Sequence, residues 1–464
     1  MTEIYQKLEE ICGKQNVSNR ELDLIVYNSD LASLPPIILK LYDIKPAEYV
    51  VRPTSSSQIS EILKLANEKK VPITPRAGAS AGLGGALAVS GGIILDLTSL
   101  DKIIGYDPEK KYIIVESGVS WKKLIKYLAK FNRKIGIHPS SSPSATIGGF
   151  ISSGGYAGIG APKFGPISEQ IINFEVVLPT GEILTVAPPF SSTFVGAEGT
   201  LGIVTKICLK TYPIKGITAL TFGFKNTRSA IQGISDLLRK GIKPYHLMLV
   251  DKYFLRLSRK LGIEVPKHNL MVFIALEGTP KNLGLQKEKI LSILTNGELI
   301  NGVFASEEWD RRYNAELFIK RAGPSMILLE IGLSLTDIPD FVSQYNELCD
   351  EKDIEVGLFG ILGHGNTMLC MPFLLADERK GMDYLKLLSL SREIINLGLG
   401  VGGTVYGVGL HNTPYLKHVY SSEALNFFKE IKNMLDPNNI LNPGKITESR
   451  VPDQLSPPPP KQKR

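Results

Sequence analysis

The chain is poor in the residues that build metal sites and disulfide frameworks. It has four cysteines and six histidines among 464 residues. No two cysteines form a CxxC pair, which excludes the usual cysteine zinc sites and redox motifs. The wide spacing also argues against a disulfide framework, so we expect free thiols in a reducing compartment. These cysteines are Cys12, Cys208, Cys349 and Cys370.

The sequence also shows no pattern typical of an export signal or of a membrane-spanning segment. The first residues, MTEIYQKLEEICGK, are charged and amphipathic and lack the apolar core of a signal peptide. The uncharged stretch at residues 77–95, which is long enough to span a membrane, contains six glycines. Because each glycine disfavours a helix by about 1 kcal/mol relative to alanine, we expect loops and strands there instead of a transmembrane helix. A cytoplasmic protein is the expectation.

Charge is nearly balanced, with 53 Lys and Arg against 46 Asp and Glu and a formal net charge of +7. The basic residues form no stripe with interleaved aromatics, which argues against nucleic-acid binding. A hydrophobic content of 43% is typical of a globular protein, and the length exceeds what one core usually supports. More than one domain is therefore expected.

The hydrophobic pattern predicts mixed helix and strand. Residues 55–68 and 120–131 have helical spacing, and the segments VPITPR, GGIILDL and YIIVESG read as strands. FEVVLPTGEILTV predicts a hairpin that turns at Thr180 and Gly181. Glycine becomes sparse near Lys215, where helices and strands begin to alternate, so a second domain starts there.

Two glycine-rich segments carry the first functional signal. PRAGASAGLGG covers residues 75–85 and PSATIGGFISSGG covers residues 143–155. Glycines of this kind let backbone N–H groups approach an anion closely, and phosphate is the natural ligand. Neither segment is a dinucleotide-binding loop of the Rossmann kind. The one literal GxGxxG, residues 398–403, follows a helical pattern instead of a strand, so we treat it as chance.

Taken in order, PRAGASAGLGG, PSSSPSATIGG, EVVLPTGEIL, GAEGTLGIVT and DPNNILNPGKI give the chain its family likeness. It resembles the D-lactate dehydrogenases and glycolate oxidase flavin subunits within the vanillyl-alcohol oxidase superfamily. The resemblance implies an α+β fold with a two-part, PCMH-type FAD-binding domain over residues 1–214 and a cap domain for the substrate over residues 215–420. Residues 421–448 would return to the flavin domain, and residues 449–464 would form a flexible basic tail.

The same resemblance assigns residues to FAD. Arg76, Gly78, Ala79, Ser80, Gly84 and Gly85 would surround the pyrophosphate; Pro143, Thr146, Gly148 and Gly149 would line the flavin; Glu198, Gly199, Gly202 and Ile203 would hold the adenosine half; and Asn442 of ILNPGK would add a contact. An ordinary tight turn is the alternative for each glycine. Ser80 stands where some relatives attach flavin through histidine, so non-covalent FAD is expected.

The family's metal site has no counterpart in this sequence. Relatives that oxidise 2-hydroxy acids carry HxGDGNxH followed by GEHGVG. Here ILGHGNTM places Ile361 and Met368 at the outer histidine positions and His364 at the aspartate, and GGTVYGVG lacks the Glu-His pair. Isoleucine and methionine provide no hard donor for a divalent ion, so we expect no catalytic metal.

A hydroxyl substrate still needs a base for its O–H proton. His364, Tyr406 and His411 are the candidates, and a structural role is the alternative for each. His138, in IHPSSSP, is expected near the flavin or capping its own loop. EEWDRRYNAELFIKRAG matches the family's WxxR element and places Arg312 on the substrate carboxylate, with a surface arginine as the alternative. A lysine common downstream in relatives is Leu328 here, which favours a less charged substrate than lactate.

Three functions remain open at this point. The first is an FAD-dependent dehydrogenase that oxidises an alcohol or 2-hydroxy acid and passes electrons to a non-NAD acceptor. The second is a flavin-binding subunit that requires a partner, and the third is a transferase like alkylglycerone-phosphate synthase. The expected partners are a small-molecule substrate and an electron-acceptor protein or second subunit, through which the chain would contact a membrane peripherally.

Overall fold

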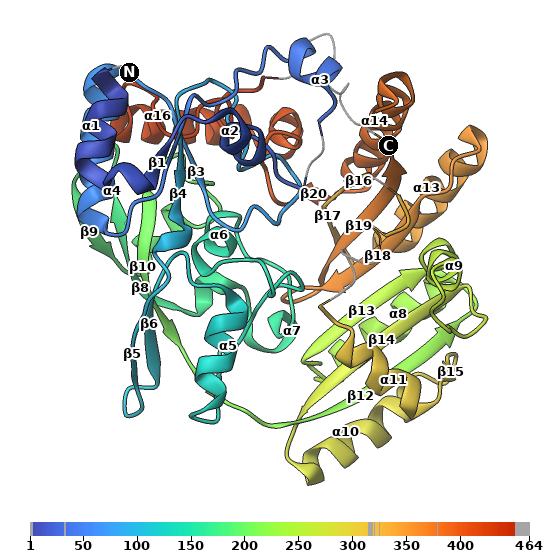
Figure 1. Cartoon of the computed structure of the whole chain (residues 1–464). Helices are drawn as coiled ribbons and strands as arrows, with labels where there is room; N and C mark the ends of the chain where they lie inside the picture. Colours follow the sequence, from blue (N-terminus) through green and yellow to red (C-terminus); the bar gives the residue numbers. More distant parts are fainter. Residues whose placement is uncertain are drawn as a thin grey trace.

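The computed structural model describes residues 3–31, 34–313, 319, 321–323, 325–377 and 379–450. Apart from residues 449 and 450, the predicted basic tail lies outside this part of the chain. Helices and strands alternate along the chain, which confirms the α+β class (Figure 1). Within the described residues, no helix is both long enough and apolar enough to cross a membrane.

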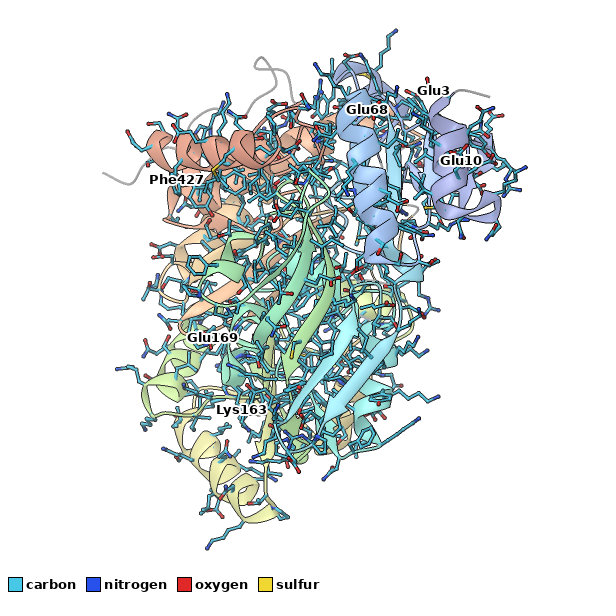
Figure 2. All side chains as sticks on the ribbon, turned by 90° about the vertical axis from the view of Figure 1, so that its left-hand side faces the viewer. Glu3, Glu10, Glu68, Lys163, Glu169 and Phe427 are labelled. Atoms are coloured by element: carbon cyan, nitrogen blue, oxygen red, sulfur yellow. The ribbon has the colours of Figure 1, made fainter. Side chains whose placement is uncertain are left out.

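A small mixed sheet begins the fold, with strand order β1-β2-β4-β3. α1 and α4 pack on it through Leu8, Ile59 and Ile62, while Glu3, Glu10 and Glu68 point outward (Figure 2). α4 starts where predicted because the Ser55 side chain accepts the N–H of Gln58. The elements are α1 Glu3–Cys12, β1 Val17–Ser18, α2 Glu21–Tyr27, α3 Pro36–Leu41, β2 Tyr49–Val51, α4 Ser56–Lys69, β3 Ile73–Arg76 and β4 Ile93–Asp96.

An antiparallel sheet of order β5-β6-β10-β8-β9 follows, with α5 and α6 against it. The predicted hairpin is present, since β8 pairs with β9 and Gly181 lies in the turn with φ of +83°. The elements are β5 Ile103–Asp107, β6 Tyr112–Glu116, α5 Trp121–Ala129, β7 Arg133–Lys134, α6 Ile147–Ser152, α7 Ala161–Phe164, β8 Ile171–Val177, β9 Ile183–Val186, β10 Ile203–Lys210 and β11 Tyr212–Pro213.

A nine-stranded sheet, here called the cap sheet, occupies the second half of the chain; its order is β15-β12-β14-β13-β18-β19-β17-β20, with β16 also on β19. Its elements are β12 Gly216–Phe224, α8 Thr227–Arg239, β13 His246–Asp251, α9 Lys252–Lys260, β14 Leu270–Gly278, α10 Pro280–Ile293, β15 Glu298–Leu299, α11 Gly302–Asp310, β16 Ser325–Leu328, β17 Ile331–Ser334, α13 Ile338–Lys352, β18 Gly357–Leu362, β19 Thr367–Ala376, α14 Gly381–Gly400 and β20 Thr404–Val405.

Side chains on the two faces of the cap sheet belong to different cores because successive residues of a strand alternate in direction. One face packs against α8, α10, α13 and α14, and Leu362 and Met368 lie in this core. The other face carries Phe273, Ile361 and Met371 and packs against α9. This second face also contacts the first half of the chain. Glu277, near the end of β14, pairs with Lys134 of β7 and Lys163 of α7.

The C-terminal segment returns to the first sheet after α15 (Leu416–Val419) and α16 (Ser422–Leu435). The N–H of Ile73 donates to Ile440 O and the N–H of Asn442 donates to Ile73 O, each at 2.7 Å. The return also reaches α4, since the Asn438 amide donates to Asn67 Oδ1 at 2.6 Å, and the outer face of α16 exposes Phe427 (Figure 2). Buried Lys432 holds the return by donating to Thr200 O and Leu441 O and pairing with Asp436.

Candidate functional site

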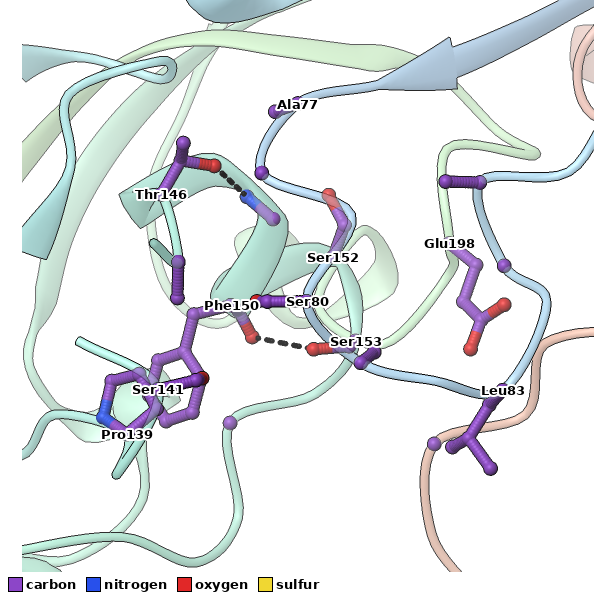
Figure 3. A pocket seen from close by; sticks show the side chains of 18 of the residues that line it. Ala77, Ser80, Leu83, Pro139, Ser141, Thr146, Phe150, Ser152, Ser153 and Glu198 are labelled. Atoms are coloured by element: carbon purple, nitrogen blue, oxygen red, sulfur yellow. Dashed lines mark hydrogen bonds between the residues drawn. The ribbon is translucent and has the colours of Figure 1, made fainter. Parts of the chain in front are cut away.

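A long cavity, here called the flavin cavity, runs between the glycine-rich loops and the cap sheet (Figure 3). Three loop regions line one side of it, at residues 75–86, 139–158 and 198–204. The opposite side comes from the cap sheet and its connections. The residues on that side are Glu330, Ile361, Leu369, Met371, Tyr406, Gly407 and Gly409.

The first loop offers a row of backbone donors. The N–H groups of residues 77–82 have no acceptor in the described part of the chain, and Ala79 adopts a left-handed conformation with φ of +48°. Left-handed residues beside right-handed ones turn successive N–H groups into one concave surface that binds anions. Arg76 precedes this loop, donates to Ser29 O at 2.5 Å and lies over the Tyr27 ring. The arrangement fits a pyrophosphate.

α6 lies on the same side of the cavity, next to the first loop (Figure 3). Thr146 starts this helix by accepting the N–H of Gly149 at 3.2 Å. A Cβ on Gly149 would meet only Thr146 Oγ1 within 4 Å, because this glycine faces the open cavity. A Cβ on Gly78, by contrast, would lie 2.4 Å from Ser144 O, so that glycine is required for close packing of the two loops.

Behind the cavity, buried charges join three separate parts of the chain. Both carboxylate oxygens of Glu198 accept the N–H of Gly409, at 2.8 and 2.7 Å. Lys445 donates to Gly84 O at 2.7 Å, and the Asn442 amide donates to Glu198 O at 2.8 Å. Asn442 and Lys445 are almost completely buried and Glu198 is half-buried, so this network fixes the loops that line the cavity.

The cap side of the cavity is mostly apolar, with two polar exceptions. Ile361, Leu369 and Met371 project from β18 and β19, and Tyr406 and Glu330 come from connections at the sheet end. The Tyr406 ring lies 4.7 Å from that of Tyr156, and burial raises the pKa of its hydroxyl. The Tyr406 N–H donates to Glu330 O at 3.2 Å. Sequence reasoning missed Glu330; its only signal is an acid inside the apolar run MILLEIGL.

His364 is not in this cavity. It is an exposed residue in the turn between β18 and β19, followed by Gly365 with φ of +68°. His364 therefore does not line the flavin cavity, and its role as the base stays a prediction that this position does not favour. The alternative, a turn residue, describes what the structure shows.

Of the other predicted catalytic residues, only Tyr406 lines the flavin cavity. His411 is half-buried behind Gly84, with its Nε2 buried, and burial lowers its pKa to about 4. The Arg312 guanidinium lies 4.3 Å from the Trp309 ring and 4.4 Å from the Tyr313 ring and lines a second cavity.

Leu328 is buried in β16. His138 is buried beside Pro139, which lines the flavin cavity, and its Nδ1 lies 3.2 Å from Ser142 Oγ.

Most residues predicted to bind the cofactor line the flavin cavity: Arg76, Gly78, Ala79, Ser80, Gly85, Thr146, Gly148, Gly149, Glu198, Gly199, Gly202 and Ile203. Three predicted positions do not. Pro143 is exposed in a turn. Gly84 packs against Leu410, and a Cβ added to Gly84 would lie 2.9 Å from the Leu410 Cβ. Asn442 lies behind the wall, as described above.

The two positions that carry metal-binding histidines in relatives are separated by the cap sheet. Ile361 faces the flavin cavity, whereas Met368 is fully buried in the core on the other face. Among the described residues, no group of three His, Cys, Asp or Glu side chains comes together closely enough to hold an ion. Ile361 and Met368 therefore do not line the same space.

Comparison with known proteins decides the family. The FAD binding domain family matches residues 47–187, and the family of FAD linked oxidases, C-terminal domain, matches residues 215–446. The chain belongs to the FAD-linked oxidases. FAD is its cofactor, and the cradle of free N–H groups and open glycine described above fits it.

Relatives of this FAD-linked oxidase share about a quarter of its residues. The glycolate oxidase subunit GlcD of Bacillus subtilis is 28% identical and the alignment covers 96% of each chain. A protein named D-lactate dehydrogenase [cytochrome], mitochondrial, of Arabidopsis thaliana is 26% identical over 87% of this chain and 74% of that one.

Solved structures share the fold at lower identity. p-Cresol methylhydroxylase has a TM-score of 0.83 at 18% identity, with 97% of each chain covered. Alkyldihydroxyacetonephosphate synthase has a TM-score of 0.77 at 18% identity, covering 96% of this chain and 84% of that one.

Proposed function

We propose that this FAD-linked oxidase oxidises the CH–OH group of an alcohol or 2-hydroxy acid, with FAD held non-covalently and no catalytic metal. One observation supports this most: a single cavity joins the anion-binding loop to Tyr406 and Glu330 on the cap side. FAD requires that arrangement, because its pyrophosphate binds one part of the cavity while its flavin ring meets the substrate in another part. Residues 1–214 and 421–448 would hold FAD, and residues 215–420 would hold the substrate.

In this proposal the cofactor is held by backbone and shape instead of a covalent bond. The pyrophosphate is surrounded by Arg76, Gly78, Ala79, Ser80 and Gly85. The flavin is lined by Thr146, Gly148 and Gly149, and the adenosine half contacts Glu198, Gly199, Gly202 and Ile203. The described lining contains no histidine or cysteine, the side chains whose nucleophilic atoms would most readily form a flavin link. Acid precipitation of the protein should therefore release all of the flavin.

Oxidation of CH–OH removes a hydride from carbon and a proton from oxygen, leaving a carbonyl. FAD, when bound, supplies the hydride acceptor. We assign the proton to the Glu330 carboxylate, which lines the cavity beside Tyr406. Tyr406 stays protonated near neutral pH because burial raises its pKa, so its hydroxyl donates a hydrogen bond to the substrate oxygen.

Arg312 is the proposed partner of a substrate carboxylate. Its guanidinium is held between Trp309 and Tyr313, and no carboxylate in the described part of the chain pairs with it. A planar guanidinium binds a carboxylate through two parallel N–H bonds, a geometry that lysine does not reproduce. Arg312→Lys should weaken binding of 2-hydroxy acids and leave neutral alcohols unaffected.

Electrons then leave for an acceptor other than NAD. We propose an electron-acceptor protein or a second subunit, with the chain in the cytoplasm and any membrane contact made through that partner. Two relatives support this: one is named a subunit, and the name of the other includes a cytochrome. Co-purification from the native host, followed by dye reduction with and without the partner, would test the requirement.

The proposed function is tested by anaerobic mixing of the yellow protein with glycolate, D-lactate, longer 2-hydroxy acids and primary alcohols. Loss of flavin absorbance reports hydride transfer whatever the acceptor is. We expect at least one of these compounds to bleach the flavin, with Arg312→Lys weakening only the acids. Full retention of flavin colour with every compound would contradict the proposal.

A further inference from the structure

A second cavity, here called the cap cavity, lies within the cap domain and measures about 350 Å³. It is enclosed by the cap-sheet strands β12, β13 and β14 on one side and by α9 and α11 on the other. None of the FAD-binding residues proposed above lines it. The lining includes Ala219, Thr221, His246, Met248, Phe254, Leu255, Ile263, Val265, Phe273, Ala275, Ala305, Trp309 and Arg312.

Buried polar atoms in this cavity lack partners in the described part of the chain. Thr221 is fully buried and its Oγ1 makes no hydrogen bond. His246 is 7% exposed and its Nδ1 makes none. A buried polar atom without a partner destabilises the fold because it has lost its hydrogen bonds to water. Since both side chains line one cavity, a ligand with polar atoms is the natural source of the missing bonds.

The lining of the cap cavity includes a cation without a carboxylate partner in the described part of the chain, Arg312. Arg311 beside it is neutralised by Glu307 and Glu308. The Arg312 Nε is also buried without a hydrogen bond, and its NH1 donates only to Trp309 O, at 2.6 Å. The Arg312 guanidinium would therefore bind an anionic group of a ligand.

Most of the remaining lining is apolar; its other polar members are Ser258, Arg321 and the paired Glu308 and Arg311. Phe254 and Leu255 project from α9, Ile263 and Val265 follow that helix, and Phe273 comes from β14. Such a lining binds hydrocarbon, because each buried methylene strengthens binding roughly fourfold. The chemistry of the lining therefore calls for a ligand with an anionic group and an apolar body.

The cap cavity adjoins the flavin cavity. Met248 lines the first, Ile361 lines the second, and the two residues are register partners on β13 and β18. Neighbouring strands lie only about 5 Å apart, so the linings of the two cavities meet at this pair of residues. Both residues are apolar, and no charged side chain stands at this pair of positions.

We infer that the cap cavity receives the side chain of the substrate, so that the substrate is a 2-hydroxy acid with an aromatic or medium-length aliphatic side chain. Its carboxylate pairs with Arg312, and its C2 carbon faces the flavin cavity. The inference rests on the proposed function and narrows its substrate class. Glycolate and D-lactate are too short to fill this space.

The first test compares 2-hydroxy acids of increasing length by anaerobic flavin reduction. We expect kcat/KM to rise roughly fourfold for each added methylene up to about six carbons, so that 2-hydroxyoctanoate and phenyllactate exceed D-lactate at least a hundredfold. Equal values for short and long acids would overturn the inference while leaving the proposed function intact.

The second test fills the cavity with Ala219→Phe, since Ala219 lines it and is partly exposed. KM for 2-hydroxyoctanoate should rise at least tenfold, and by a larger factor than KM for D-lactate, whose methyl group fills little of this cavity. Val303→Phe is the matched control because Val303 lies on α11 but is 65% exposed. Unchanged KM for both acids in Ala219→Phe would contradict the inference.

Calorimetry with octanoate, which carries no hydroxyl to oxidise, separates the two failures. Octanoate should bind the wild-type holoenzyme at least tenfold more tightly than acetate, and Ala219→Phe should abolish the difference. If octanoate binds in this way but no 2-hydroxy acid bleaches the flavin, the proposed function is wrong. If 2-hydroxy acids bleach the flavin but octanoate binds no better than acetate, only the cap cavity assignment is wrong.

Discussion

Met248 and Ile361 face each other on neighbouring strands of the cap sheet, and each lines a different cavity. In relatives of this family the position of Ile361 belongs to a histidine-rich motif. Here that position presents a hydrocarbon surface to the substrate space, continuous with the apolar lining around Met248. The chemistry must therefore depend on polar groups elsewhere in the cavity.

The first prediction concerns the histidine of the ILGHGNTM motif. His364→Ala should leave the rate of flavin reduction unchanged and alter the free energy of unfolding by less than about 0.5 kcal/mol, as is usual for an exposed turn residue. Stopped-flow reduction and urea unfolding measure both quantities. A hundredfold slower reduction would restore His364 as the base.

Proton transfer is predicted to depend on Glu330. Glu330→Gln should keep its flavin spectrum and slow flavin reduction by about a hundredfold or more, the scale of losing a positioned base. Stopped-flow anaerobic mixing of each protein with the substrate measures this rate.

Tyr406→Phe is the companion variant because it removes one hydroxyl and keeps the ring against Tyr156. It should slow reduction about tenfold, as the loss of one hydrogen bond implies. A full rate in Glu330→Gln with a hundredfold loss in Tyr406→Phe would move the base to the tyrosine.

Much of this site could be predicted from sequence because its signals are local. The loop at residues 75–85 and the start of α6 at Thr146 follow from glycine spacing and helix capping, which depend on a few neighbouring residues. The hairpin at Gly181 has the same origin. The order of these segments along the chain was enough to indicate FAD.

The cap side could not be predicted in the same way because it depends on which face of a strand each residue occupies. The motif placed Ile361, His364 and Met368 together, but the hairpin separates them into the cavity face, the exposed turn and the opposite core. Glu330 sits between two short strands, so only the folded sheet shows where it lies. The cap cavity likewise arises from packing of helices that follow different strands.

The FAD site itself is tested by Gly149→Val. Its side chain would enter open cavity space, since only Thr146 Oγ1 lies within 4 Å of the Cβ position. We expect the purified variant to be folded but colourless, and flavin titration to show at least a hundredfold weaker FAD binding. Gly284→Val, at an open and exposed position of α10, is the matched control and should stay yellow. Equal flavin content in both variants would argue against this wall of the site.

Acid should destabilise the protein through buried histidines. Burial lowers the pKa of His138 to about 3 and those of His246 and His411 to about 4, below the ordinary value of 6.5. The unfolded chain therefore binds more protons as the pH falls through 6.5, and stability is lost by about 2 kcal/mol per histidine between pH 7 and 5. Urea midpoints at the two pH values, with saturating FAD, measure this loss.

His411→Gln provides the matched comparison, since it removes one imidazole with a buried Nε2 outside both cavities. The difference in its urea midpoint between pH 7 and pH 5 should be smaller than that of the wild type. Exposed His364→Gln should leave the difference unchanged. An identical pH response in all three proteins would show that His411 does not titrate as described.

The most direct test of this account is the rate of anaerobic flavin reduction before and after prolonged treatment with a chelator, with metal content measured on the same sample. Protein side chains, and not a divalent ion, are proposed to position and deprotonate the substrate. The account predicts one rate for treated and untreated enzyme, with the preferred 2-hydroxy acid and no stoichiometric zinc or manganese. Loss of reduction on chelation, restored by adding either ion, would contradict it.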